Sequence, residues 1–281
     1  MTLTAADLGL AAGRAPALDE DFHVHSTFSD GTSTISENLA AAEARGLRTI
    51  CMTEHVRAGT TWLPEFVSAV AGLRPPAGLA VRTGVEAKIL DMTGRLDLPG
   101  DLSGIDLVLI ADHQFPADVG PVDPAALGRD LADGAVSPAD VLECLAEATA
   151  NAASTVRTGI LAHLFSVLPK VGLSEDDVPD ALLSWLAGRL RDAGAVAEVN
   201  EKWSCPAPRT VAALARAGVA LVASSDSHHS SDVGSYRSVR RTVGTAFGAG
   251  TVFGAGTVFG AGTVFGAGTV FGAGLGDGAG P

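Results

Sequence analysis

The chain has 281 residues, of which 47% are hydrophobic and 18% charged, so it can bury a sizeable core and is not disordered throughout. With 19 Lys and Arg against 32 Asp and Glu, its formal net charge is −13, which repels a phosphate backbone and argues against a dedicated duplex binder. Cys51, Cys144 and Cys205 are odd in number and form no CxxC pair. We therefore expect reduced thiols and a cytoplasmic protein rather than a disulfide framework or a thiolate zinc site.

The two ends of the chain differ from its middle. Residues 1–19 carry Asp7 and Arg14 among apolar residues, unlike a secretory signal, and are expected to form an N-terminal extension. Residues 245–274 are five tandem hexapeptides, TAFGAG once and TVFGAG four times. We expect residues 245–281 to be a low-complexity, glycine-rich tail that is flexible or self-associating. A membrane helix fits less well because half of each TVFGAG unit is Gly or Thr, and five hexads are too few for a stable β-helix.

Between these ends, short apolar runs rich in β-branched residues alternate with helical patterns. Seven strands are expected, at residues 20–25, 48–53, 80–86, 106–112, 159–163, 195–200 and 219–225. Helices are expected at residues 36–45, 62–73, 138–153, 180–193 and 207–217, and a hairpin at 88–98 around Met92-Thr93-Gly94. Strict alternation implies parallel strands with helices outside, in either a closed barrel or a wide doubly wound sheet.

The histidines favour the barrel. All seven lie at or just beyond the C-terminal end of an expected strand: His23, His25, His55, His113, His163, His228 and His229. Four acids share these positions, namely Asp30, Glu54, Glu86 and Asp226. In a closed parallel barrel every strand points its C-terminal end at one face, where groups distant in sequence converge. Residues 20–244 are therefore expected to form one α/β barrel domain.

This ring of side chains predicts a metal centre. Taken singly, a histidine at a strand end is more often hydrogen-bonded or partly exposed than a metal ligand. His23-x-His25, however, places two imidazoles on one side of a strand, and Asp226-x-His228 repeats the spacing. Imidazoles and carboxylates without cysteine suit zinc, manganese or iron. Because the candidates outnumber the four ligands of one zinc ion, we expect two or three ions.

Six motifs in order give the sequence a specific resemblance over about 210 residues. They are DFHVHSTFSDG at 21–31, TEH at 53–55, GVE at 84–86, ADH at 111–113, AHL at 162–164 and SDSH at 225–228. The set resembles the polymerase and histidinol phosphatase (PHP) superfamily of metal-dependent phosphoesterases. The resemblance implies a distorted seven-stranded β/α barrel, in agreement with the strand count, and a trinuclear metal site.

The resemblance also implies a distribution of ligands. One ion would be held by His23, His25, Glu86 and Asp226; a second by Glu86, His113 and His163; and a third by Asp30, His55 and His228. Glu86 would bridge the first two ions. Asp30 occupies a position that is His in some members of the family. This difference puts the occupancy of the third metal site in question. His229 matches no role in the family.

The chemistry expected of this cluster is hydrolysis of a phosphate ester by a metal-activated hydroxide, with Glu86, Asp226 and His228 as the catalytic ligands. Arg57, Lys88 and Lys202 lie just past strand ends and are expected to contact the anionic substrate, while Arg95 and Arg237 are weaker candidates. Asn200 and Glu201 are candidates for orienting the ligands.

Several functions remain open. One is a histidinol-phosphate phosphatase, another a phosphoesterase for nucleotides or short oligonucleotides, and a third a metal-stabilised scaffold whose tail binds partners. Polymerase proofreading is disfavoured because no polymerase domain accompanies the barrel. Specificity is expected in the loops at 56–63, 114–136 and 164–178. The expected partner is a small phosphorylated substrate, without stable binding to duplex nucleic acid or to a membrane; the oligomeric state is left open.

Overall fold

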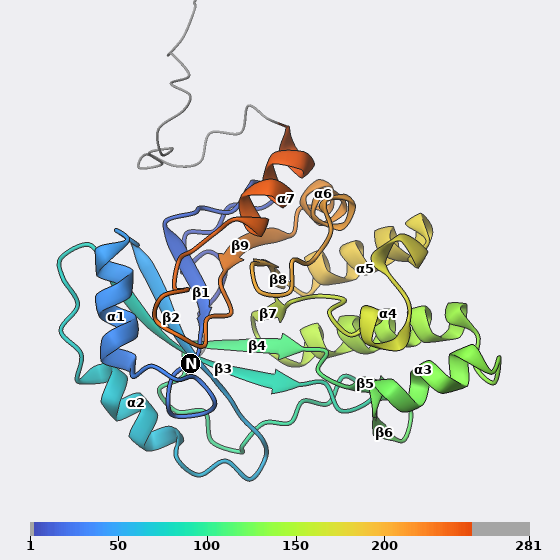
Figure 1. The fold of residues 1–281 in the computed structure, drawn as a ribbon, viewed down its shortest axis with the longest axis horizontal. Helices are drawn as coiled ribbons and strands as arrows, with labels where there is room; N and C mark the ends of the chain where they lie inside the picture. The colour runs from blue at the N-terminus through green and yellow to red at the C-terminus, as the bar shows by residue number, and fades with distance from the viewer. Residues whose placement is uncertain (1–2, 249–281) are drawn as a thin grey trace, which may run out of the picture.

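A computed structural model describes residues 3–248 of the chain and contains a seven-stranded parallel sheet. Its strands, in spatial order, are β1 (Glu20–Val24), β2 (Thr49–His55), β3 (Ala80–Lys88), β4 (Leu107–Ala111), β7 (Gly159–Ala162), β8 (Val196–Asn200) and β9 (Ala220–Ser224). Each of the seven expected strands is present within a few residues of its expected bounds. The order in space follows the order in the chain, as in a β/α barrel (Figure 1).

The sheet closes between its first and last strands. An isolated parallel bridge joins Val24 to Ser227, three residues beyond the end of β9. The backbone N–H of His25 donates to the carbonyl of Ser227 at 2.8 Å, and the N–H of Ser227 donates to the carbonyl of His23 at 3.2 Å. The result is a nearly closed, distorted seven-stranded β/α barrel, which confirms the fold expected from the sequence.

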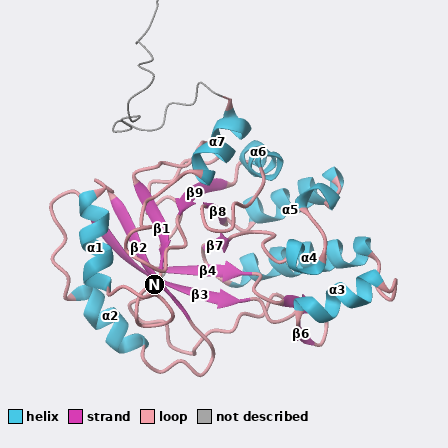
Figure 2. Ribbon diagram, in the orientation of Figure 1, coloured by secondary structure: helices cyan, strands magenta, loops and turns pink. Residues whose placement is uncertain are grey.

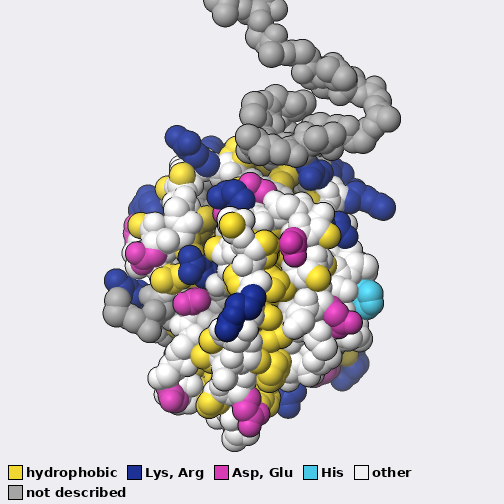
Figure 3. All heavy atoms as spheres, turned by 90° about the vertical axis from the view of Figure 1, so that its left-hand side faces the viewer, with side chains coloured by type: hydrophobic (Ala, Val, Ile, Leu, Met, Phe, Trp, Pro, Cys, Tyr) yellow, Lys and Arg dark blue, Asp and Glu magenta, His cyan; other side chains and the backbone are white. Residues whose placement is uncertain are grey.

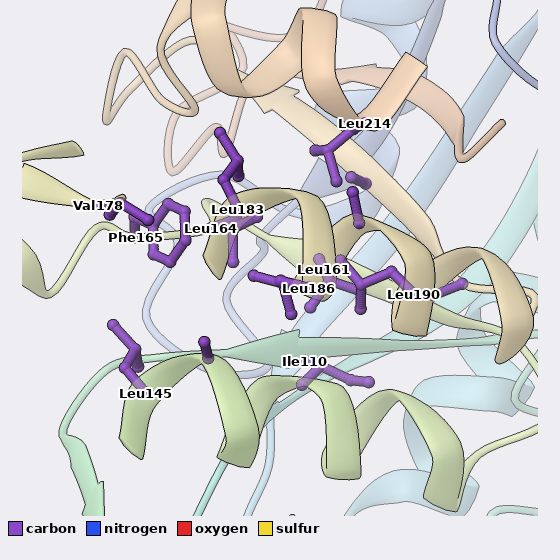
Figure 4. Packing of buried hydrophobic residues seen from close by; sticks show 14 of the residues in the cluster. Ile110, Leu145, Leu161, Leu164, Phe165, Val178, Leu183, Leu186, Leu190 and Leu214 are labelled. Atoms are coloured by element: carbon purple, nitrogen blue, oxygen red, sulfur yellow. The ribbon is translucent and has the colours of Figure 1, made fainter. Parts of the chain in front are cut away.

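Helices surround the barrel (Figure 2). They are α1 (Ile35–Ala44), α2 (Leu63–Ala71), α3 (Pro124–Ala132), α4 (Pro138–Thr155), α5 (Asp180–Asp192), α6 (Pro208–Ala217) and α7 (Ser238–Phe247), with 3-10 turns at Leu168–Val171 and Glu175–Asp177. Figure 4 shows Leu161 of β7 beside Leu186 and Leu190 of α5, and Ile110 of β4 on the side of its strand that faces α4; Leu145 of α4 belongs to the same cluster. Burial of such side chains supplies the main favourable free energy of folding.

A second, smaller core fills the barrel itself. It includes Phe22, Cys51, Leu109, Ile160 and Val222, one each from five strands. Leu3, Ala5, Leu8 and Leu10 of the N-terminal extension pack against this core. Because Leu3 donates to the carbonyl of Asp106, just before β4, the extension lies at the N-terminal end of the strands. That end is opposite the one where the histidines lie.

The structure adds elements that the sequence patterns did not indicate. The segment 114–136, expected to be a loop, contains a short hairpin of β5 (Phe115–Ala117) with β6 (Gly120–Val122) and then α3. Helix α7 was also unexpected, and its last turn, Thr245–Phe247, lies within the segment assigned to the repeat. Residues 249–281, with the four TVFGAG units, lie outside the described residues.

The hairpin expected at 88–98 is present as a tight turn with one antiparallel bridge, Ile89 to Leu96. Gly94 has φ +80°, and a Cβ there would lie 2.2 Å from the backbone nitrogen of Ala152, so this turn needs glycine. On the face shown in Figure 3, basic, acidic and apolar side chains are interspersed. Among residues 3–248, no helix is both long and apolar enough to cross a membrane.

Candidate metal centre

The carboxyl ends of the strands bring nine side chains together, each of them expected as a metal ligand. Glu86 lies near the end of β3, and its carboxylate is at the centre of the group. Its Oε1 lies 2.9 Å from Nε2 of both His113 and His163. Its Oε2 lies 2.8 Å from Nδ1 of His55 and 3.2 Å from Nε2 of His23. One carboxylate therefore contacts histidines that follow or belong to four different strands.

Three overlapping groups within the cluster have ligand atoms all within 4.8 Å of one another. They are His23, His25 and Asp226; His55, Glu86 and His113; and His25, Asp30, His55 and His228. The first group is the set implied for one ion without Glu86, and the third group is the set implied for another ion with His25 added. The second group contains His55 in place of His163. His163 nevertheless contacts the same oxygen of Glu86 as His113 does.

The candidate ligands are more deeply buried on one side of the cluster than on the other. The side chains of His23, His25, Glu86, His163 and Asp226 are at most 3% exposed. His55, His113 and His228 are 25–32% exposed, and Asp30 is 54% exposed. The deep part is thus shielded from water, whereas the part near Asp30 is open for a substrate to approach.

The buried charges near Glu86 influence one another. Burial opposes ionisation of Glu86, but the charge on His23 and hydrogen bonds from His113 and His163 hold the pKa of Glu86 well below its usual range. Burial lowers the pKa of His25 to about 3, despite its bond to Asp226. Glu86 is therefore an anion and His25 a neutral imidazole, whereas neighbouring carboxylates raise the pKa of His23 and of His163 despite their burial.

The cluster fits divalent cations. Oε2 of Glu86 and Nδ1 of His25 are both buried, and neither has a hydrogen-bond partner of acceptable geometry. A buried carboxylate oxygen without a donor is costly unless a cation balances it. Glu86 and Asp226 add two buried carboxylates to the same region. The donor set of imidazole nitrogens and carboxylate oxygens is the one that zinc, manganese and iron accept.

Behind these residues lie two carboxylates, Glu198 and Asp112, which the sequence motifs did not indicate as ligands. Glu198, in β8, is fully buried, with Oε2 lying 3.1 Å from Nδ1 of His23. Asp112 lies 3.4 Å from Nδ1 of His163 and accepts a 2.6 Å hydrogen bond from Ser166. A carboxylate on the far nitrogen fixes the tautomer and orientation of a ligating histidine. The position of Asp112 beside His113 was a signal for this role; Glu198 sits in an apolar run that gave none.

Glu54, next to His55, organises the loop that carries Asp30. It is fully buried and accepts hydrogen bonds from the backbone N–H of Ser26 at 3.0 Å and from the hydroxyls of Ser26 and Ser29. Burial raises the pKa of Glu54 to about 7. Its oxygens are thus engaged in holding the loop rather than directed at the cluster.

The two residues expected to orient ligands differ in their contacts. The amide of Asn200 donates to Glu198 at 2.7 Å and lies 3.5 Å from Asp226, so it does reach a candidate ligand. The carboxylate of Glu201 instead accepts from the backbone N–H groups of Arg237, Ser238 and Val239. It therefore caps the N-terminus of α7, and the expectation that it orients a ligand is wrong.

Two adjoining cavities open at the cluster. The smaller, about 270 Å³, is lined by seven of the candidate ligands together with Lys202 and Trp203. The larger, about 950 Å³, shares Asp30, His55, Glu86 and His113 with it and extends past Arg57 and Lys88 to Phe28 and Trp62. Each of the three cations expected to contact substrate therefore lines a cavity beside the cluster.

The remaining polar candidates lie elsewhere. Arg95 pairs with Asp91 at 2.9 Å and lines neither cavity, and Arg237 precedes α7. His229 is exposed and its Nδ1 lies 2.9 Å from the hydroxyl of Ser231, away from Glu86 and its neighbours. The absence of a role for His229 in the resemblance agrees with this position.

Fold and cluster together define a class of protein, a parallel β/α barrel with a cluster of potential metal ligands at the carboxyl ends of its strands. The PHP domain model matches residues 21–123. A probable phosphatase of Thermoanaerobacter sp. (strain X514) is 27% identical over 239 residues, which cover 80% of this chain and 85% of that protein. A probable phosphatase of Photobacterium profundum is 37% identical over 99 residues, 34% of this chain and 40% of the other.

Among solved structures, the fold is similar to that of a histidinol phosphate phosphatase from Lactococcus lactis in complex with zinc, L-histidinol and phosphate. The TM-score is 0.57 at 17% identity, over 83% of this chain and 94% of the other. The PHP domain match over residues 21–123 agrees with the resemblance that the motifs carry, and the relative that matches most of the chain is named a probable phosphatase.

Proposed function

We propose that the protein is a metal-dependent phosphatase that hydrolyses a small phosphate monoester at a centre of two or three divalent ions. The observation that carries this proposal is the position of Glu86, one buried carboxylate with both oxygens within 3.2 Å of histidine nitrogens. That arrangement is suited to a ligand shared between two ions. A structural site with four ligands would not need nine candidates.

The residues of the site would perform four tasks, of which the first is to hold the metal ions. His23, His25, Glu86 and Asp226 would hold one ion, Glu86 with His113 and His163 a second, and Asp30 with His55 and His228 a third. Divalent ions, when bound, would polarise a phosphoryl oxygen and lower the pKa of a water molecule. The second task is to orient the ligands: Glu198 contacts Nδ1 of His23, and Asp112 contacts Nδ1 of His163.

The cations supply the third task, which is to bind the phosphate. Nζ of Lys202 lies 3.1 Å from Nδ1 of His228 and 3.4 Å from Oδ1 of Asp226, beside the ligands themselves. Lys88 lies 3.0 Å from Gln114 in the larger cavity, to which Arg57 also contributes. Positive charges on both sides of the centre would hold the ester across it.

The fourth task is recognition of the leaving group. Phe28 and Trp62 line the larger cavity, with ring centroids 5.9 Å apart, and offer apolar ring faces some distance from Glu86. A substrate whose leaving group carries a flat ring would fit there. Histidinol phosphate, with its imidazole, and nucleotides both meet this description. The histidinol bound in the Lactococcus lactis protein favours the first, and the size of the cavity, about 950 Å³, leaves room for the second.

The proposal has a direct test. Purified full-length protein is analysed for metal content and assayed with p-nitrophenyl phosphate, then with histidinol phosphate, nucleoside monophosphates and short oligonucleotides. We expect two to three equivalents of zinc, manganese or iron, and phosphate release that stops on chelation and returns with metal. Less than one equivalent under metal-replete conditions, or release that survives chelation, would reject it.

We also propose that this activity resides in the cytoplasm. Cys51, Cys144 and Cys205 are all free thiols, and Cys51 and Cys205 are buried. Burial raises the pKa of Cys51 to about 12, so it is an inert thiol. A protein with three unpaired thiols suits the reducing cytoplasm.

A further inference from the structure

One contact to the candidate centre comes from Trp203, an aromatic residue that lines the smaller cavity. The indole N–H of Trp203 donates to Oδ2 of Asp226 at 2.9 Å. The other oxygen of that carboxylate, Oδ1, lies 3.5 Å from Nε2 of His25 and 3.5 Å from Nδ1 of His228. The two oxygens of Asp226 thus have different partners: one faces the indole, and the other faces the histidines.

Asp226 needs such a contact because its backbone does not direct it. Its φ is +53°, in the left-handed region that residues other than glycine seldom occupy. It lies two residues beyond the end of β9, so the alternation of side chains along a strand no longer determines where the carboxylate points. The rotation of its carboxylate is then determined by side-chain contacts.

Trp203 is itself held in place on three sides. Its backbone N–H donates to Oδ1 of Asn200 at 2.9 Å. Nζ of Lys170 lies 4.5 Å from the centroid of its ring, and the ring of His163 lies 5.7 Å away. These contacts hold the indole against its neighbours, even though the residue is 40% exposed.

Other donors to Asp226 are longer. The amide of Asn200 lies 3.5 Å from Oδ2, and Nζ of Lys202 lies 3.4 Å from Oδ1. Lys202 has a flexible side chain that is 43% exposed, and it contacts the oxygen that faces the histidines. The indole is thus the short, rigid contact, and it engages the oxygen that points away from His25.

We propose that Trp203 is a positioning residue for the metal centre: its indole N–H fixes the carboxylate of Asp226 so that Oδ1 is presented with His23 and His25 to one ion. This inference rests on the proposed function, since it assumes that Asp226 is a ligand. Loss of a hydrogen bond behind a ligand typically costs about 10- to 100-fold in metal affinity. We expect a loss of that size at the site to which Asp226 contributes.

The test compares two tryptophans that differ only in their surroundings. Trp203→Phe removes the N–H and keeps an aromatic ring beneath Lys170. Trp185→Phe is the matched control. Trp185 is 41% exposed and has Arg189 5.3 Å from its ring, as Trp203 has Lys170 near its own, but it lies on α5 rather than beside Asp226. The full-length variants are stripped of metal and titrated with Zn²⁺ in competition with a chromophoric chelator. Unfolding midpoints of the metal-free forms check that both are folded.

We expect Trp203→Phe to bind one zinc ion about 10- to 100-fold more weakly than the unaltered protein, and Trp185→Phe to bind as the unaltered protein does. A second readout is the visible spectrum of the Co²⁺-substituted protein, which reports ligand geometry and should change only in Trp203→Phe. Equal zinc affinities and spectra in all three proteins would overturn this inference and leave the proposed function intact. If the unaltered protein bound no metal, the proposed function would fail, and the inference with it.

Trp203→Ala separates the hydrogen bond from the packing of the ring. If Trp203→Phe binds normally and only Trp203→Ala is weakened, the ring and not the N–H supports the site, which also overturns the inference.

Discussion

Nε2 of His163 lies 2.9 Å from Oε1 of Glu86, although 77 residues separate the two in the chain. They follow or belong to β7 and β3, two strands that β4 separates in the sheet. The contact is possible because all seven strands run parallel and carry their ligands at the same end. Glu86 is consequently the residue whose loss should affect most of the centre.

We expect Glu86→Ala to lose at least two equivalents of metal and to lower kcat/KM by more than 100-fold, because both proposed deep sites share its carboxylate. Metal analysis and phosphate release measure the two effects. His229→Ala is the control, as this exposed histidine contacts Ser231 rather than the cluster. Equal losses of metal in the two variants would show that the ligands have been wrongly assigned.

Asp30 should control only the outermost ion. Its carboxylate lies 3.3 Å from His228 and 3.4 Å from His55 but is 54% exposed. We expect Asp30→Asn to lower the metal content by about one equivalent and to leave the deep pair bound. Asp192→Asn, which changes a 65% exposed acid on α5, should leave the metal content unchanged. A complete loss of metal in Asp30→Asn would mean that the three sites do not fill independently.

Gly31 determines where Asp30 lies. A Cβ on Gly31 would be 2.7 Å from the carbonyl carbon of His25 and 2.7 Å from the nitrogen of Ser26, both backbone atoms that cannot move aside cheaply. We expect Gly31→Ala to displace the loop and to reproduce the metal loss of Asp30→Asn. Gly100→Ala is the control, because a Cβ there meets nothing within 4 Å. Full metal content and activity in Gly31→Ala would contradict the role given to this glycine.

The end of the folded domain can be located by truncation. Val239 and Val243 of α7 are fully buried, and Phe247 packs against the hydrophobic cluster that contains Ile110 and Leu161. A chain ending at Val243 loses the last turn of this helix, so we expect its melting temperature to fall by several degrees, at about 2–4 °C per kcal/mol for a domain of this size.

A chain ending at Gly248 keeps α7 intact, and every proposed ligand precedes residue 229. We expect its melting temperature and its kcat/KM for p-nitrophenyl phosphate to equal those of the full chain. A lower value of either would show that residues 249–281 contribute to stability or catalysis. Scanning calorimetry and the phosphatase assay distinguish these outcomes.

The sequence by itself determined the strand order and which residues lie at the functional face. Short runs rich in apolar and β-branched residues located all seven strands of the barrel, because a parallel strand buried on both faces is largely apolar. Histidines at the ends of those runs then located the face, since parallel strands leave only one place for them to meet. The boundary at residue 245 was misleading, because the repeat begins inside α7, where TAF serves as the last turn of a helix.

Only the tertiary structure decided which side chains support the ligands. The register between β1 and β2 shifts between Asp21 and Val24, so Phe22 packs inside the barrel while the next residue, His23, reaches Glu86. Strict alternation along a strand cannot predict this. Glu198 likewise gained its role through contact with His23, 175 residues away in the sequence, and Trp203 through contact with Asp226, which is 23 residues away but lies beyond the next strand. Local patterns report the burial and direction of a side chain, but a partner more than a hundred residues away is fixed only when the barrel closes.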